Sequence, residues 1–183
     1  MSKTTELRQQ TFTAPAAAEN TSVLAAQTLP ASGTTVVTAG ITNPDVPRTV
    51  RLKGNQATVQ GLQVIVTGTD IQGNALSETV TMGNAFATPT DTVNAFATVI
   101  SVTLPTRGAS GDTISFGKGA ALGLDSYCDQ YSFSGFGGVT SYTYSTTVIA
   151  RNTITLSATL DGATNQAVNY IPNTFPTYGR AWG

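Results

Sequence analysis

The chain has 183 residues, of which 10% are charged against about 25% in typical soluble domains, and its formal net charge at pH 7 is -1. The electrostatic field of so small a net charge cannot concentrate phosphate groups around the protein, which argues against nucleic acid as the main partner. The sequence has no histidine, which excludes a Ser/His/Asp triad and any histidine ligand for a metal.

The remaining reactive residue types also lack the neighbours that catalysis needs. Cys128 is the only cysteine, so no internal disulfide can form, and the acids at Asp125 and Asp129 disfavour its thiolate. No pair of carboxylates is recognisable as an acid and a base, and Asp91 and Asp112 would have to meet in a cleft to make one. We therefore expect a protein that is not an enzyme, with no cofactor and no metal site.

Targeting segments are not evident. The first ten residues, MSKTTELRQQ, carry charges where an export signal needs an apolar run, so we expect synthesis in a cytoplasm without export. One uncharged run, residues 130–150, has about the length of a membrane span, but its serines, threonines, tyrosines and glycines argue against one. We expect no membrane segment.

Residues 1–30 are predicted to form an extended N-terminal arm. Alanine, proline and small polar residues alternate there without holding a helical or a strand period, although residues 19–27 could form a short helix. Such a segment cannot bury itself alone, so we expect it to be either mobile or laid along a partner, and to be ordered only in an assembly. Its apolar residues are the candidate partner-binding anchors: Leu7, Phe12, Val23 and Leu24.

Residues 31–123 are predicted to form an all-β core, an antiparallel β-sandwich or barrel-like domain. Apolar residues recur there with period two between glycine, proline and asparagine turns. Strands are predicted over residues 34–41, 48–54, 61–69, 75–82, 95–105 and 113–119. The turn at residues 70–74 is expected to join two of them as a hairpin. One strand is predicted to place four residues on a single face: Phe96, Ile100, Val102 and Leu104.

Glu78 conflicts with this pattern. Strict alternation points it inward with Leu76 and Val80, where an unpaired carboxylate is costly. Either a β-bulge turns it outward, or it forms an ion pair with a base such as Arg48 or Arg51 on a neighbouring strand.

Residues 124–183 form a region rich in glycine and tyrosine that begins with a change of composition near Gly123. Residues 150–162 alternate as a strand and end in Asp161-Gly162, a strong hairpin signal. The segment 165–183 is predicted to be an extended C-terminal arm, ordered only in an assembly. Its aromatic residues are the second set of partner-binding anchors: Tyr170, Phe175, Tyr178 and Trp182.

Two further patterns permit ligand binding. The stretch DIQGN at residues 70–74 is faintly similar to a calcium loop but lacks the later acidic positions. A group of aromatic residues could form a sugar-stacking platform, although packing in a core or interface is the simpler interpretation. These aromatic residues are Tyr127, Tyr131, Phe133, Tyr142 and Tyr144.

The low content of lysine and glutamate leaves strand edges poorly protected against pairing with another chain, so we expect self-association or docking to cover them.

Residues 46–124 resemble small β-rich structural proteins of tailed bacteriophages, including capsid decoration (cement) proteins. The stretches that carry the resemblance are VIVTGTDIQGNALSETVTM, FATVISVTLP and GDTISFGKGAALGL. The resemblance implies a homotrimer on the outer capsid surface of a virion, with the major capsid protein as partner. The alternatives are a tail, head-to-tail connector or fibre-base protein, and a carbohydrate-binding β-sandwich module.

Overall fold

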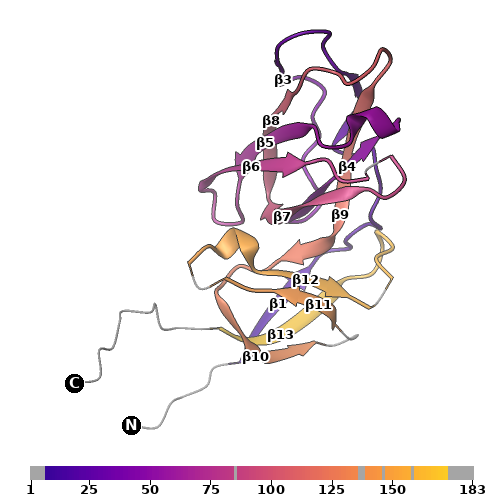
Figure 1. Cartoon of the computed structure of the whole chain (residues 1–183). Helices are drawn as coiled ribbons and strands as arrows, with labels where there is room; N and C mark the ends of the chain where they lie inside the picture. Colours follow the sequence, from indigo (N-terminus) through magenta and orange to yellow (C-terminus); the bar gives the residue numbers. More distant parts are fainter. Residues whose placement is uncertain (1–6, 85, 136–138, 146, 158, 173–183) are drawn as a thin grey trace, which may run out of the picture.

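A computed structural model gives the fold of residues 7–84, 86–135, 139–145, 147–157 and 159–172, with the backbone alone at 129–135, 139, 140 and 171 (Figure 1). Nearly all of its regular structure is β, which confirms the predicted fold class. The strands are β1 (Arg8–Phe12), β2 (Leu24–Thr28), β3 (Thr35–Val37), β4 (Arg48–Gly54), β5 (Gln63–Thr69), β6 (Ala75–Thr81), β7 (Thr90–Phe96), β8 (Thr98–Leu104), β9 (Thr113–Gly123), β10 (Cys128–Gly135), β11 (Val139–Thr143), β12 (Thr153–Leu156) and β13 (Gln166–Pro172). Two short 3-10 turns, η1 (Ala57–Val59) and η2 (Ile149–Arg151), lie between them.

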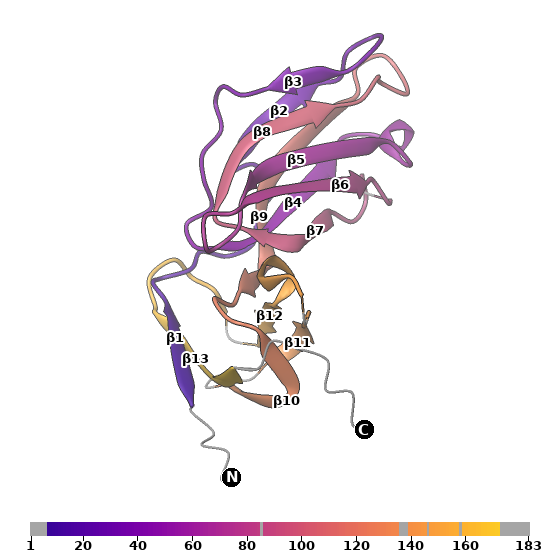
Figure 2. The same cartoon turned by 90° about the vertical axis from the view of Figure 1, so that its left-hand side faces the viewer.

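The strands form three antiparallel sheets. A four-stranded sheet has the order β3-β8-β5-β6, and a six-stranded sheet has the order β11-β12-β9-β4-β7 with β2 paired to β9. A three-stranded sheet has the order β1-β13-β10. Figures 1 and 2 show the four-stranded sheet packed against part of the six-stranded sheet at one end of the molecule, with the three-stranded sheet at the other end. The upper half is therefore a β-sandwich.

The sandwich encloses the first hydrophobic core. Alternation builds it, because Val64 and Val66 on β5 are fully buried while Ile65 and Thr67, which each follow one of them, are half-buried. Each fully buried aliphatic side chain contributes about 1.5–3 kcal/mol relative to an exposed one. The core also contains Leu29, Val50, Leu52, Val59, Met82, Phe96, Val102, Leu104, Ile114 and Phe116.

The strand predicted over residues 95–105 is two strands, β7 and β8, and its predicted face is partly wrong. Phe96, Val102 and Leu104 are buried, but Ile100 is 57% exposed. The cause is a shift in the β5–β8 register between Thr67 and Gly68, which is the signature of a β-bulge. One extra residue in the bulged strand reverses the direction of the side chains beyond it.

A second core lies between the three-stranded sheet and the lower part of the six-stranded sheet. Its buried residues are Phe12, Val46, Leu122, Leu124, Cys128, Ile154, Leu156, Val168 and Tyr170. Strand β9 takes part in both cores, with Phe116 in the first and Leu122 in the second. The composition change near Gly123 thus falls at the end of a strand that the two cores share.

The two segments predicted to lie on a partner are built into the chain's own sheets. Residues 8–12 form β1, which pairs along its whole length with β13, from Arg8 opposite Tyr170 to Phe12 opposite Gln166. Residues 24–28 form β2 on β9, and no helix forms at residues 19–27. The expectation of order only in an assembly is therefore wrong for residues 8–30 and 166–172, because pairing with distant strands satisfies their backbone groups.

The two predicted turns differ in outcome. The hairpin at residues 70–74 is confirmed: β5 and β6 pair from Gln63–Thr81 to Thr69–Ala75, and Gly73 has a φ of 84°. Gly162 also turns the chain, with a φ of 73°, but it does not close a hairpin. Strand β12 pairs with β11 and β9, whereas β13 pairs with β1 and β10, so this turn carries the chain from one sheet to another.

Candidate interaction surfaces

The outer face of the four-stranded sheet is free of charged side chains. Glu78 is the one charged residue in its strands, all of which the structure describes, and it lies opposite the fully buried Val66 on the inward side. The register aligns Val36, Thr103, Ile65 and Thr79 in one row across the sheet. We define the outer face as Val36, Gln63, Ile65, Thr67, Ser77, Thr79, Thr81, Ser101 and Thr103.

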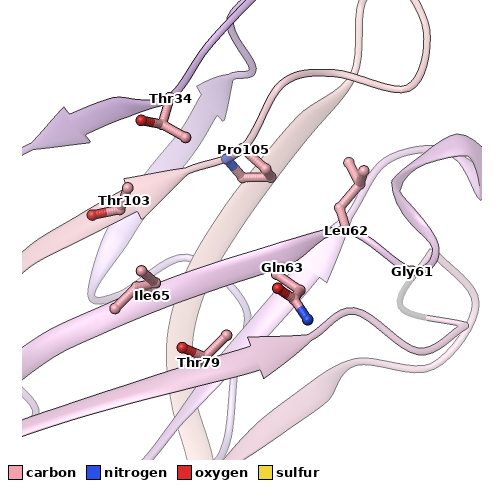
Figure 3. Close-up of a pocket in the computed structure, with 8 residues that line it drawn as sticks. All are labelled: Thr34, Gly61, Leu62, Gln63, Ile65, Thr79, Thr103 and Pro105. Atoms are coloured by element: carbon pink, nitrogen blue, oxygen red, sulfur yellow. The ribbon is translucent and has the colours of Figure 1, made fainter.

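The outer face contains an open hollow of about 490 Å³ (Figure 3). It is lined by Thr34, Gly61, Leu62, Gln63, Ile65, Thr79, Thr103 and Pro105. The side chains of Leu62, Ile65 and Pro105 present carbon atoms, and three threonines present hydroxyl groups. No lining residue is titratable, so the hollow suits an uncharged group better than a reaction that moves protons.

A second feature is a polar cluster that joins the paired strands β1 and β13 to the segment after β9. Arg8 on β1 donates to Asp125 Oδ2 at 2.9 Å, and the Tyr170 hydroxyl on β13 donates to Asp125 Oδ1. Arg8 also donates to the Ser126 hydroxyl. Burial of Tyr170 raises the pKa of its hydroxyl, and its hydrogen bond to Asp125 raises the pKa further. The cluster therefore keeps Tyr170 protonated and ties β1 and β13 to the segment after β9.

The residues predicted to anchor a partner have different fates. Phe12, Val23, Leu24 and Tyr170 are at most 3% exposed within the chain's own cores, so their prediction as exposed anchors is wrong. Burial in the chain's own cores explains why these side chains are largely apolar. Leu7, immediately before β1, is 64% exposed and stays available to a partner. The remaining predicted anchors lie outside the described residues: Phe175, Tyr178 and Trp182.

The acidic residues fix the chain's own structure. The sequence has ten acidic residues, and the side chains of all but Glu6 and Asp129 are described. Each described carboxylate accepts a hydrogen bond from its own chain: Glu19, Asp45, Asp70, Glu78, Asp91, Asp112, Asp125 and Asp161. Short-range sequence patterns could not identify the distant donors among these.

Glu78 points inward as the alternation predicts, but it does not form the predicted ion pair with Arg48 or Arg51. Its carboxylate accepts the backbone N–H groups of Val93 at 2.7 Å and Asn94 at 2.9 Å, both on β7. It also accepts the Asn94 side-chain amide. Glu78 therefore bridges the edges of two sheets, β6 of the four-stranded sheet and β7 of the six-stranded sheet.

The two arginines have other partners. Arg51 forms a bidentate pair with Asp91, with Nε–Oδ1 at 2.7 Å and Nη2–Oδ2 at 2.9 Å. Hydrogen bonding to Asp91 raises the pKa of Arg51 although burial opposes it. Arg48 is fully buried and pairs with Asp45. Both pairs are structural, because they join neighbouring strands or loops inside the fold.

Asp91 and Asp112 do not share a site. Asp91 holds Arg51, while Asp112 accepts the N–H groups of Gly108 and Ala109 and the Thr58 hydroxyl. Among the described residues no cluster of three or more cysteine, aspartate or glutamate side chains could hold a metal ion. In the stretch faintly similar to a calcium loop, Asp70 instead accepts the backbone N–H groups of Gln72 and Asn74 and closes the hairpin turn.

Among the described side chains of the aromatic region, Tyr142 and Tyr144 form a stacked pair. The rings of Tyr142 and Tyr144 lie nearly parallel, 8° apart, with centroids 6.0 Å from each other. The Tyr142 hydroxyl donates to the Cys128 carbonyl, and Tyr144 is 44% exposed. Tyr127 donates to the Thr147 carbonyl. The side chains of Tyr131 and Phe133 lie outside the described residues.

Comparison with known proteins gives no relative. No protein-family model, no curated protein and no solved structure matches the chain. Within the part of the chain that the structure describes, no helix has the length and apolar character needed to cross a membrane.

Proposed function

We propose that this chain is a virion structural protein that binds the outside of an assembled capsid as a cement, or decoration, protein. The observation that supports the proposal most is that the charged and the uncharged polar groups lie in different places. The described carboxylates hold the chain's own loops and strands, while an entire sheet face presents only hydroxyl, amide and apolar groups. Proteins with an uncharged face can pack beside one another in many copies on a shell without electrostatic repulsion between these faces.

Cementing needs no chemistry beyond binding. A protein that binds only the assembled shell stabilises that shell by mass action, by about 2.7 kcal/mol per site when its concentration is 100 times the Kd. Contacts repeated over a lattice add through avidity, so each contact can be weak. The partner in this proposal is the major capsid protein, and a homotrimer is the expected form, as the resemblance of residues 46–124 to phage decoration proteins implies.

The copy number per particle tests this proposal. Virus particles purified from a culture that produces this chain would be digested, and the chain would be quantified by mass spectrometry against the major shell protein. A count comparable with the shell protein is expected for a cement protein. A count of about a dozen or fewer, typical of a ring at one symmetry axis, would instead favour a tail, connector or fibre-base protein. Absence from the particles would contradict a virion role.

The stacked tyrosine pair favours a second candidate function, a carbohydrate-binding module. A parallel pair with one ring 44% exposed offers a surface on which a sugar ring could stack. Binding on a glycan array that disappears in Tyr144→Ala and persists in Ile100→Lys would support this candidate. Equal binding by both variants would exclude the tyrosine pair as the platform.

A further inference from the structure

The hollow in the outer face has the chemistry of a pocket for an aromatic side chain. Its volume of about 490 Å³ lies within the usual range of ligand pockets, about 300–1,000 Å³. Its lining combines the apolar side chains of Leu62, Ile65 and Pro105 with three threonines that carry hydroxyl groups, Thr34, Thr79 and Thr103 (Figure 3). A tryptophan or tyrosine matches such a lining, because its ring is apolar and its single N–H or O–H needs a hydrogen-bond acceptor.

The chain itself contains a segment of matching chemistry. Residues 173–183, NTFPTYGRAWG, hold Phe175, Tyr178 and Trp182 and a single charged side chain, Arg180. A segment this poor in charge suits an uncharged face, and buried aromatic residues are the commonest anchors of protein interfaces. Fully extended, these residues reach at most about 40 Å from Pro172.

The place where this segment begins indicates which copy it can reach. Pro172 ends β13 in the three-stranded sheet, whereas the hollow lies between the ends of β5 and β8 at the opposite end of the molecule (Figures 1 and 2). Arg8 pairs with Tyr170, so β13 runs away from the β1–β2 connection and toward the free end of that sheet. Pro172, to which the segment is attached, therefore lies at the other end of the molecule from the hollow of the same copy.

We propose that residues 173–183 of one copy bind the outer face of a second copy, with Trp182 in the hollow. The tail and the hollow are different surfaces, so the contact is heterologous and continues around a ring, or along a filament if the ring does not close. A closed ring of three would be the expected homotrimer. The proposal goes beyond the cement function, because it concerns self-association of the isolated protein and is measured without a capsid.

Sedimentation velocity on the full-length protein tests this association. The wild-type mass is expected to rise with concentration, and either Trp182→Ala or Ile65→Lys is expected to weaken association by at least about tenfold, as for an anchor or its pocket. The matched control is Ile100→Lys, which places the same charge on β8 outside the hollow and should associate as the wild type does.

Mixing the two variants distinguishes this geometry from any other interface. Trp182→Ala keeps an intact hollow and Ile65→Lys keeps an intact tail, so the mixture should form a heterodimer that neither variant forms alone. A synthetic peptide of residues 173–183 should also dissociate the wild-type oligomer, whereas the same peptide with alanine in place of tryptophan should not. A wild-type protein that stays monomeric, an equal effect of Ile100→Lys, or a peptide without effect would overturn the proposal.

Discussion

Arg48 carries a guanidinium group that is completely buried, yet almost every donor has an acceptor. Its Nε donates to the Gly119 carbonyl at 2.8 Å, and its Nη1 donates to the Ala16 carbonyl at 2.9 Å and to Asp45 Oδ1 at 3.1 Å. Burial lowers the pKa of this side chain, and the Asp45 carboxylate opposes that effect. One side chain thereby joins β4, β9 and the segment between β1 and β2.

Replacing Arg48 with leucine is expected to lower the free energy of unfolding by about 3–5 kcal/mol. The substitution leaves the Gly119 and Ala16 carbonyls without a donor and removes the partner of Asp45. Urea unfolding followed by circular dichroism measures the change. Arg151→Ala, at an exposed site, is the control and should stay within about 0.5 kcal/mol of the wild type. A similarly small effect of Arg48→Leu would contradict a structural role.

Asp161 provides a pH-dependent prediction. Its carboxylate accepts the N–H groups of Ala163 and Thr164 and the Thr164 hydroxyl, and these bonds lower its pKa from 3.8 to about 2. Because the folded pKa is depressed, the stabilisation of the turn is fully present above pH 3.8 and is lost as the pH falls through about 2.

An NMR titration of the Asp161 carboxyl carbon measures this pKa directly. The amide signals of Ala163 and Thr164 should move with the same midpoint, since both donate to the titrating group. Thr164→Ala removes only the hydroxyl donor and should shift the midpoint part of the way toward the ordinary value. A wild-type midpoint near 3.8 would show that the turn does not hold the carboxylate.

At the scale of elements, alternation in the sequence locates most strands, because the side-chain period of two is a local property. The strand predicted over residues 48–54 is β4 with the same bounds, and residues 75–82 contain β6. Pairing is a non-local property, so the sequence could not show that residues 8–12 lie beside residues 166–172. Phe12 and Tyr170 are predicted from the sequence as anchors for a partner, whereas in the structure that pairing buries them inside the chain.

The outer face is likewise predictable from the sequence only where it depends on local alternation. Alternation through Gln63, Ile65 and Thr67 is enough to predict an uncharged outward face on β5. The hollow within that face also needs Gly61 and Pro105, which come from the connections before β5 and after β8. No local pattern places these two residues beside each other.

The bridge between the two sheets gives a prediction at this scale. Glu78→Ala leaves the N–H groups of Val93 and Asn94 on β7 without their acceptor, so we expect a loss of about 1–3 kcal/mol in stability. Hydrogen exchange of these two amides should accelerate more than that of other β7 amides. Thr81→Ala, on the exposed side of the same strand, is the control and should change neither quantity appreciably. Unchanged exchange at Val93 and Asn94 would contradict the bridge.

At the scale of the whole molecule, two hydrophobic cores are stacked along one shared strand. Strand β9 contributes Phe116 to the first core and Leu122 to the second. The paired strands β1 and β13 contribute buried residues to the second core alone. The elements that hold the ends are therefore separated from the sandwich that carries the outer face. This arrangement allows the three-stranded sheet to open locally while the sandwich stays folded.

Phe12→Ala tests this separation. Phe12 is 2% exposed in the second core, and truncating a buried phenylalanine costs about 3–5 kcal/mol. Hydrogen exchange measured by mass spectrometry should show β1 and β13 losing protection together, since each pairs with the other, while β5 and β8 in the first core retain theirs. Leu7→Ala, at a side chain 64% exposed, is the control and should leave both sheets protected. Equal loss in all four strands would show that the two cores unfold as one cooperative unit, and protection retained by β13 alone would contradict its pairing with β1.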